Sequence, residues 1–166
     1  MNKGIKIVVA GPRGKMGKET IDMILHTPSF QLVGLLDRII DDSIDNRLIN
    51  LTVYTDAKKC FVETKPDVYI DFTVAEAAFE YAKIALSLGV RAVIGTTGLK
   101  DEQLEELMEL SEKTKTACIV PPNFAIGAIL MMKFSQMAAK FFHQAEIIEM
   151  HHDQKKDAPS GTAIKT

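Results

Sequence analysis

The feature that most constrains the fold is a glycine loop between a predicted strand and a predicted helix. Residues 5–10 form a short apolar run, and residues 11–17 follow with the spacing GxxGxxG. The three glycines allow a tight turn, a close backbone approach to a pyrophosphate, and close packing of the helix on the strand. The N–H groups at the start of the helix then face the phosphates. The sequence therefore predicts a dinucleotide-binding half-domain.

An acidic residue at the end of the next strand supports this prediction. Residues 30–37 read FQLVGLLD, and Asp37 lies about 20 positions after the last loop glycine, the offset of a carboxylate that binds the adenosine ribose. Arg38 follows directly, and a guanidinium pairs with the 2′-phosphate of NADP. The two residues together indicate NADH or NADPH, with a solvated arginine as the alternative for Arg38. Arg13 and Lys15 either add positive charge near the phosphates or are simply exposed.

Short apolar runs alternate with amphipathic stretches through most of the chain. Apolar strands bounded by helices indicate a parallel sheet covered on both faces. We predict an α/β, Rossmann-type doubly wound parallel sheet in residues 1–124, followed by an incomplete α+β substrate domain in residues 125–166. The predicted strands are 5–10, 30–37, 51–54, 67–72, 90–94 and 117–120, and the predicted helices are 16–25, 57–63 after an N-cap at Asp56, 75–88 and 101–115, with a loop at 41–50.

The pattern changes in the last part of the chain. Residues 127–142 are apolar and methionine-rich and predict a helix, and the alternating residues 145–151 predict a strand. That strand has no evident partner, and a lone strand leaves its backbone groups unpaired. Ser160 is typical of a helix N-cap, yet too few residues follow for a stable helix. We therefore expect a fragment of a longer protein, or partner chains that complete the second domain.

Composition narrows the class of protein. The net charge of −2 over 166 residues gives no basis for a nucleic-acid partner or a polybasic membrane patch. Cys60 and Cys118 lie in or near apolar runs and predict buried, reduced thiols. The apolar N-terminal run is too short for a signal peptide, and no run approaches membrane-spanning length. We expect a cytoplasmic protein.

Two further loops leave the ends of predicted strands. They are GTTG at residues 95–98 and PPNF at residues 121–124. Ligands of doubly wound sheets lie outside the carboxyl ends of the strands, and small hydroxyl residues suit a nicotinamide carboxamide. Ordinary turn chemistry is the alternative for each loop. Thr73 either touches the cofactor or caps the next helix, and capping is favoured.

The segment EMHHDQKKDAPSGT at residues 149–162 concentrates chemically active side chains. On a strand, His151 and His152 would point to opposite faces and serve different roles. Lysine and histidine act as proton donors, and the N–H groups of residues 160–162 suit a carboxylate. The segment predicts an anionic small-molecule substrate, with a solvated charged loop as the alternative. No cysteine or third histidine falls at zinc-ligand spacing, so we predict no metal site.

These motifs resemble those of the dihydrodipicolinate reductase family. Residues 149–162 match its signature E-x-H-H-x-x-K-x-D-A-P-S-G-T, and GxxGxxG, GTTG and NF-x-IG occur in the family's order. The resemblance implies NADH- or NADPH-dependent reduction of 4-hydroxy-tetrahydrodipicolinate, a small dicarboxylate, in lysine and diaminopimelate biosynthesis by a homotetramer. It disfavours a relative of homoserine dehydrogenase. A non-catalytic nucleotide-binding module or a truncated inactive fragment is the alternative.

The resemblance also assigns residues. Proton transfer would fall to His151 and Lys155, and substrate binding to His152, Gly161 and Thr162. Cofactor binding would involve Gly11, Pro12, Arg13, Gly14, Lys15, Met16 and Gly17 at the pyrophosphate, Asp37 and Arg38 at the ribose, Gly95, Thr96 and Thr97 at the nicotinamide, and Pro121, Pro122, Asn123 and Phe124. Family members continue for about another domain beyond these motifs.

Overall fold

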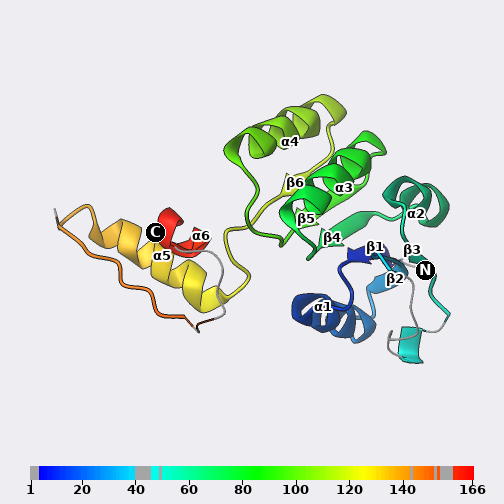
Figure 1. The fold of residues 1–166 in the computed structure, drawn as a ribbon, viewed down its shortest axis with the longest axis horizontal. Coiled ribbons are helices and arrows are strands. Elements are labelled where there is room, and N and C mark those ends of the chain that lie inside the picture. Colours follow the sequence, from blue (N-terminus) through cyan, green and yellow to red (C-terminus); the bar gives the residue numbers. More distant parts are fainter. Residues whose placement is uncertain (1–3, 40–45, 49, 143, 152, 154–158) are drawn as a thin grey trace. The chain divides into compact units, whose positions relative to one another are not determined.

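The computed structural model describes residues 4–39, 46–48, 50–142, 144–151, 153 and 159–166. The chain divides into two units, Met1–Val120 and Pro121–Thr166, which we call the N-terminal and C-terminal units (Figure 1).

The N-terminal unit is built on a six-stranded sheet in the order β3-β2-β1-β4-β5-β6, in which every neighbouring pair is parallel. The order reverses between β1 and β4, which is the switch point where ligands of doubly wound sheets bind. The predicted Rossmann-type fold is confirmed. The strands are β1 (Ile5–Ala10), β2 (Phe30–Leu36), β3 (Val53–Tyr54), β4 (Val68–Asp71), β5 (Arg91–Ile94) and β6 (Cys118–Ile119).

Helices cover both faces of this sheet. They are α1 (Lys15–Leu25), α2 (Ala57–Thr64), α3 (Ala75–Ser87) and α4 (Asp101–Thr114), with a short 3-10 turn η1 (Asn46–Leu48) in the segment predicted as a loop. Figure 1 shows α2, α3 and α4 on one side of the sheet and α1 on the other. The alternation along β1 matches this arrangement, because Val8 and Ala10 pack with α2 and α3 while Ile7 and Val9 pack with α1.

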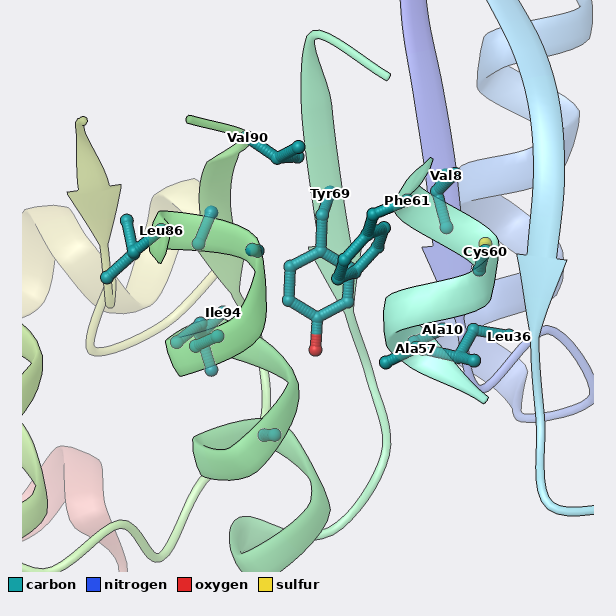
Figure 2. Close-up of a cluster of buried hydrophobic side chains, with 14 of the residues drawn as sticks. Val8, Ala10, Leu36, Ala57, Cys60, Phe61, Tyr69, Leu86, Val90 and Ile94 are labelled. Carbon is teal, nitrogen blue, oxygen red and sulfur yellow. The ribbon is translucent and has the colours of Figure 1, made fainter. Parts of the chain in front are cut away.

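An aromatic pair lies at the centre of the larger core cluster. The rings of Phe61 and Tyr69 meet edge to face with their centroids 5.3 Å apart (Figure 2). Cys60 lies beside them, and burial raises the pKa of its thiol to about 12. Burial also raises the pKa of the half-buried Cys118. Both cysteines are free thiols, and the predicted burial holds for Cys60 but only partly for Cys118. The raised pKa values do not activate either thiol as a nucleophile.

The C-terminal unit departs from the prediction in three places. Its described helices are α5 (Ile126–Ala138), shorter than expected, and α6 (Gly161–Lys165). The predicted strand at 145–151 is wrong, since those residues are irregular and the described part of this unit contains no strand to pair with them. The short helix α6 does form, because the Ser160 hydroxyl accepts a hydrogen bond from the Ala163 N–H at 3.1 Å and the helix packs against α5.

Large apolar side chains of the C-terminal unit stay exposed. Phe134, Phe141 and Ile148 are 62%, 79% and 83% exposed, and Met132 is the buried residue of α5. Although α5 is rich in apolar residues, these residues do not form a packed core within this unit. None of the described helices is long and apolar enough to cross a bilayer.

The predicted N-cap of α2, Asp56, can be tested by mutation. The Asp56 carboxylate accepts a hydrogen bond from the Lys59 N–H at 2.7 Å. We expect Asp56→Ala to lower the free energy of unfolding by about 1 kcal/mol in urea denaturation, because an N–H of the first turn loses its partner. Asp56→Ser, which restores an oxygen acceptor, should recover most of that loss. Equal stability of the alanine variant and the unmodified protein would contradict the capping role.

Candidate functional site

The glycine loop after β1 is held by backbone contacts that exclude side chains. Gly11 has φ +74°, and a Cβ there would lie 2.5 Å from the Phe72 carbonyl oxygen. A Cβ on Gly17 would lie 2.1 Å from the Gly11 carbonyl oxygen, whereas one on Gly14 would approach it only to 3.5 Å. The outer glycines are therefore required by the fold itself. The middle glycine leaves open backbone at the head of α1, where a phosphate of a dinucleotide would fit.

Arg13 links this loop to the end of β2. Its Nε donates a hydrogen bond to Asp37 Oδ2 at 3.0 Å, and its Nη2 lies 2.6 Å from Oδ1. The Arg38 N–H also donates to Asp37 Oδ1, at 2.6 Å. The side chains of Arg13 and Asp37 are only 24% and 14% exposed, so Arg13 is not simply a solvated arginine. The acid predicted to face the ribose is thus paired with a cation from the loop predicted to hold the pyrophosphate.

A cavity of about 220 Å³ opens beside this pair. It is lined by Gly11, Asp37, Arg38, Phe72, Thr73, Val74, Ala77 and Tyr81. Four of these residues are absent from the predicted site: Phe72, Val74, Ala77 and Tyr81. Val74, Ala77 and Tyr81 follow one another at intervals of three and four positions, from the N-cap of α3 into the helix. This spacing puts them on one face of the helix, and it could have identified them from the sequence.

Tyr81 gives the cavity an aromatic wall. Burial raises the pKa of its phenol, as do the negative charges of Asp71 and Asp37, while Arg38 lowers it. The phenol therefore stays neutral near physiological pH and can act as both hydrogen-bond donor and acceptor.

A buried carboxylate organises the ends of β4 and β5. Asp71 Oδ1 accepts hydrogen bonds from the Thr73 N–H and hydroxyl, each at 2.8 Å, and from the Thr96 hydroxyl at 2.5 Å. The Tyr69 hydroxyl donates to Oδ2. Burial and the Asp71 charge raise the pKa of Tyr69 well above its ordinary value. The capping role predicted for Thr73 is wrong, since α3 begins after Val74 without a side-chain cap and the Thr73 hydroxyl is drawn to Asp71.

Other residues of the three predicted cofactor loops, at 11–17, 95–98 and 121–124, are placed as follows. The Gly95 N–H donates to the Asp71 carbonyl at 2.8 Å, while Thr97 is exposed. Lys15 and Met16 are exposed at the start of α1, and Pro12 is buried. Pro121 and Pro122 are half-buried in the C-terminal unit, and Phe124 is exposed.

The C-terminal unit brings two predicted motifs together. Asn123 Nδ2 donates to the Thr162 hydroxyl at 3.0 Å, and Asn123 Oδ1 accepts from the Ala125 N–H at 2.8 Å. The Ser160 N–H, predicted to be part of an anion site, instead donates to the Glu149 carboxylate at 2.9 and 3.2 Å. A carboxylate ligand would therefore have to use the N–H groups that follow Ser160.

The remaining predicted residues of this unit are only partly described. His151 Nδ1 lies 3.9 Å from Glu149 Oε2, and the imidazole is 40% exposed. His152 and Lys155 lie outside the described residues.

Family models match nearly the whole chain. The model described as dihydrodipicolinate reductase, N-terminus, matches residues 5–124, and the one described as dihydrodipicolinate reductase, C-terminus, matches residues 127–166. The chain belongs to the dihydrodipicolinate reductase family. The resemblance found in the motifs is confirmed.

Individual relatives of this family are similar over almost all of the chain. The 4-hydroxy-tetrahydrodipicolinate reductases of Bacillus velezensis and Geobacillus thermodenitrificans are 52% and 53% identical over 99% and 98% of it. The chain spans 63% of the length of each of these relatives. A dipicolinate-bound dihydrodipicolinate reductase from Paenisporosarcina sp. TG-14 superposes with a TM-score of 0.82 at 44% identity, over 98% of this chain and 63% of that one.

More distant structures share the fold alone. A homoserine dehydrogenase from S. aureus is 16% identical with a TM-score of 0.60, over 70% of this chain and 32% of that one. Its similarity shows only that the Rossmann-type unit is common to both proteins.

The glycine loop yields a paired test of the geometry. Gly17→Ala should lower the free energy of unfolding by about 2–3 kcal/mol, because its Cβ collides with backbone that cannot move aside. Gly14→Ala should cost less than about 1 kcal/mol, since only an ordinary contact forms at that N-cap. Thermal or urea unfolding of the two variants measures the difference. Equal losses would show that the close approach of α1 to the loop is not what requires glycine at position 17.

Proposed function

We propose that this chain is part of an NADH- or NADPH-dependent 4-hydroxy-tetrahydrodipicolinate reductase that acts in lysine and diaminopimelate biosynthesis in the cytoplasm. The observation that carries the proposal is the glycine loop, in which Gly17 packs on the Gly11 carbonyl. The Asp37 carboxylate lies beside this loop, at the switch point of the sheet. The names of the relatives supply the reaction. We assign residues 1–124 to dinucleotide binding, and residues 125–166 to the start of the substrate and oligomerisation domain.

The N-terminal unit would hold the dinucleotide along the carboxyl ends of its strands. The backbone N–H groups that open α1 would bind the pyrophosphate, which is acceptor-rich and negatively charged. Asp37 would accept from a ribose hydroxyl, since a carboxylate has about four lone-pair sites and its present bonds to Arg13 and Arg38 leave room for one more donor. Tyr81 and Arg38 would flank the adenine.

The charges around the ribose support the use of either cofactor. Arg13, Asp37 and Arg38 carry two positive charges and one negative charge in one place. Because Arg13 neutralises Asp37, a 2′-phosphate would meet net positive charge rather than a bare carboxylate. A ribose hydroxyl would still find an acceptor there. Dual use of NADH and NADPH follows from this pairing.

The C-terminal unit would hold the substrate and move its protons. A bound NADH or NADPH supplies the hydride, and His151 and Lys155 would supply or accept the proton that accompanies it. His152, Gly161 and Thr162 would bind the substrate carboxylates, with Asn123 fixing the Thr162 hydroxyl. The dipicolinate named in the Paenisporosarcina structure is a small dicarboxylate, as this assignment requires. A homotetramer is part of the same proposal.

Turnover and binding together test this function. We expect the purified protein to oxidise NADH when given 4-hydroxy-tetrahydrodipicolinate. The variant carrying His151→Ala and Lys155→Ala should lose turnover by at least about a hundredfold while binding NADH within about twofold, because general acid–base groups contribute about that much to rate. Unchanged turnover in this variant would refute the site. Tight NADH binding without turnover in the unmodified protein would favour a nucleotide-binding module instead.

Arg38 gives a second test, of cofactor choice. Arg38→Ala should weaken NADPH binding about tenfold, the value of one charge-assisted contact, and NADH binding less than about threefold. Fluorescence titration of the reduced cofactors measures both. Arg91→Ala is the matched control, since Arg91 is an exposed arginine at the opposite end of the sheet, where β5 begins. Equal weakening of both cofactors by Arg38→Ala would remove Arg38 from recognition of the 2′-phosphate.

A further inference from the structure

Arg13 is held by contacts with two residues at the end of β2. Its Nε donates a hydrogen bond to Asp37 Oδ2 at 3.0 Å, and its Nη2 lies 2.6 Å from Asp37 Oδ1. Nη2 also donates to the Ile39 carbonyl at 3.0 Å. The planar guanidinium thus binds the residues on both sides of Arg38, and these contacts fix its place beside the carboxylate.

Arg13 and Arg38 together use most of the acceptor capacity of Asp37. A carboxylate has about four lone-pair sites, divided equally between its two oxygens. At Oδ1 both are used, by Arg13 and by the Arg38 N–H at 2.6 Å. At Oδ2 one is used, by the Arg13 Nε. Asp37 therefore keeps a single acceptor site for a ligand, and that site is on Oδ2.

The cavity shows which member of the Arg13–Asp37 pair a ligand meets. Asp37 and Arg38 line it, whereas Arg13 is not among its lining residues. A ribose bound there meets Asp37 directly and Arg13 only through Asp37. Arg13 can thus change what the carboxylate accepts without itself touching the ligand. This step rests on the proposed function, which puts the adenosine ribose at Asp37.

We propose that Arg13 is a positioning residue that limits Asp37 to one ribose hydroxyl, so that binding does not depend on a free hydroxyl at the 2′ position. NADH offers a 2′-hydroxyl and a 3′-hydroxyl there, whereas NADPH offers the 3′-hydroxyl and a 2′-phosphate. The single free site on Oδ2 accepts one hydroxyl from either cofactor. Without Arg13 the carboxylate would accept both hydroxyls of NADH and would set an unbalanced negative charge against the phosphate of NADPH.

Fluorescence titration with NADH and with 2′-deoxy-NADH tests the inference. In the analogue the adenosine ribose lacks only its 2′-hydroxyl. We expect the unmodified protein to bind the two ligands within about threefold of each other, because Asp37 accepts one hydroxyl in both cases. This comparison needs no variant, so it tests the single acceptor site even if a substitution disturbs folding.

Removal of Arg13 should create a discrimination that the unmodified protein lacks. In Arg13→Ala both oxygens of Asp37 have free lone pairs, and NADH should bind at least about tenfold more tightly than 2′-deoxy-NADH, the value of one charge-assisted hydrogen bond. NADPH binding should weaken about tenfold, because the charge of Asp37 is no longer balanced.

A double variant shows whether Arg13 acts through Asp37. In the variant carrying Arg13→Ala and Asp37→Asn, the discrimination between NADH and 2′-deoxy-NADH should disappear. An amide has one acceptor oxygen, and the Arg38 N–H uses one of its lone pairs. Arg47→Ala is the matched control, because Arg47 pairs with Asp22 at 2.9 Å and neither residue lines the cavity. It should leave the affinities for all three ligands within about twofold of those of the unmodified protein.

Four results would count against the inference. If the unmodified protein binds NADH at least about tenfold more tightly than 2′-deoxy-NADH, Asp37 already accepts both hydroxyls and the inference alone is overturned. Equal binding of these two ligands by Arg13→Ala would also overturn it. Discrimination that persists in the double variant would assign it to a residue other than Asp37, with the same consequence. Failure of the unmodified protein to bind NADH at all would refute the proposed function together with the inference.

Discussion

The close packing of Gly17 on the Gly11 carbonyl is the contact on which the rest of the site depends. A Cβ at position 17 would lie 2.1 Å from that oxygen, so α1 can begin directly over the end of β1 only with glycine there. This start places Arg13 within reach of Asp37 at the end of β2. One backbone contact therefore sets both the start of α1 and the ion pair at the end of β2.

The carboxyl edge of the sheet is divided into two chemically different parts. At β1 and β2 it presents backbone N–H groups, two arginines and a neutralised acid, which suit phosphate and ribose. At β4 and β5 the buried Asp71 carboxylate accepts hydrogen bonds from the hydroxyls of Thr73 and Thr96.

Hydrogen bonds hold the C-terminal unit together more than buried apolar side chains do. Asn123 holds Thr162, and Glu149 holds the backbone of Ser160 ahead of α6. Apolar side chains such as Phe141 and Ile148 stay largely exposed in the same unit. The PSGT motif is thus held by hydrogen bonds from two distant loops, one to the Ser160 backbone and one to the Thr162 hydroxyl, and these support a five-residue helix that has no core of its own.

The sequence by itself determined the elements whose signals are local. The apolar runs gave the six strands, Asp56 and Ser160 formed the predicted caps, and the glycine spacing gave the loop. Tertiary structure decided what depends on distant partners. Among the described residues, the alternating segment 145–151 has no strand to pair with. Arg13 is the counter-ion of Asp37, and the Thr73 hydroxyl donates to Asp71 instead of capping a helix. A cap or a turn is satisfied within a few residues, whereas a ladder, an ion pair or a buried carboxylate needs groups brought together by the fold.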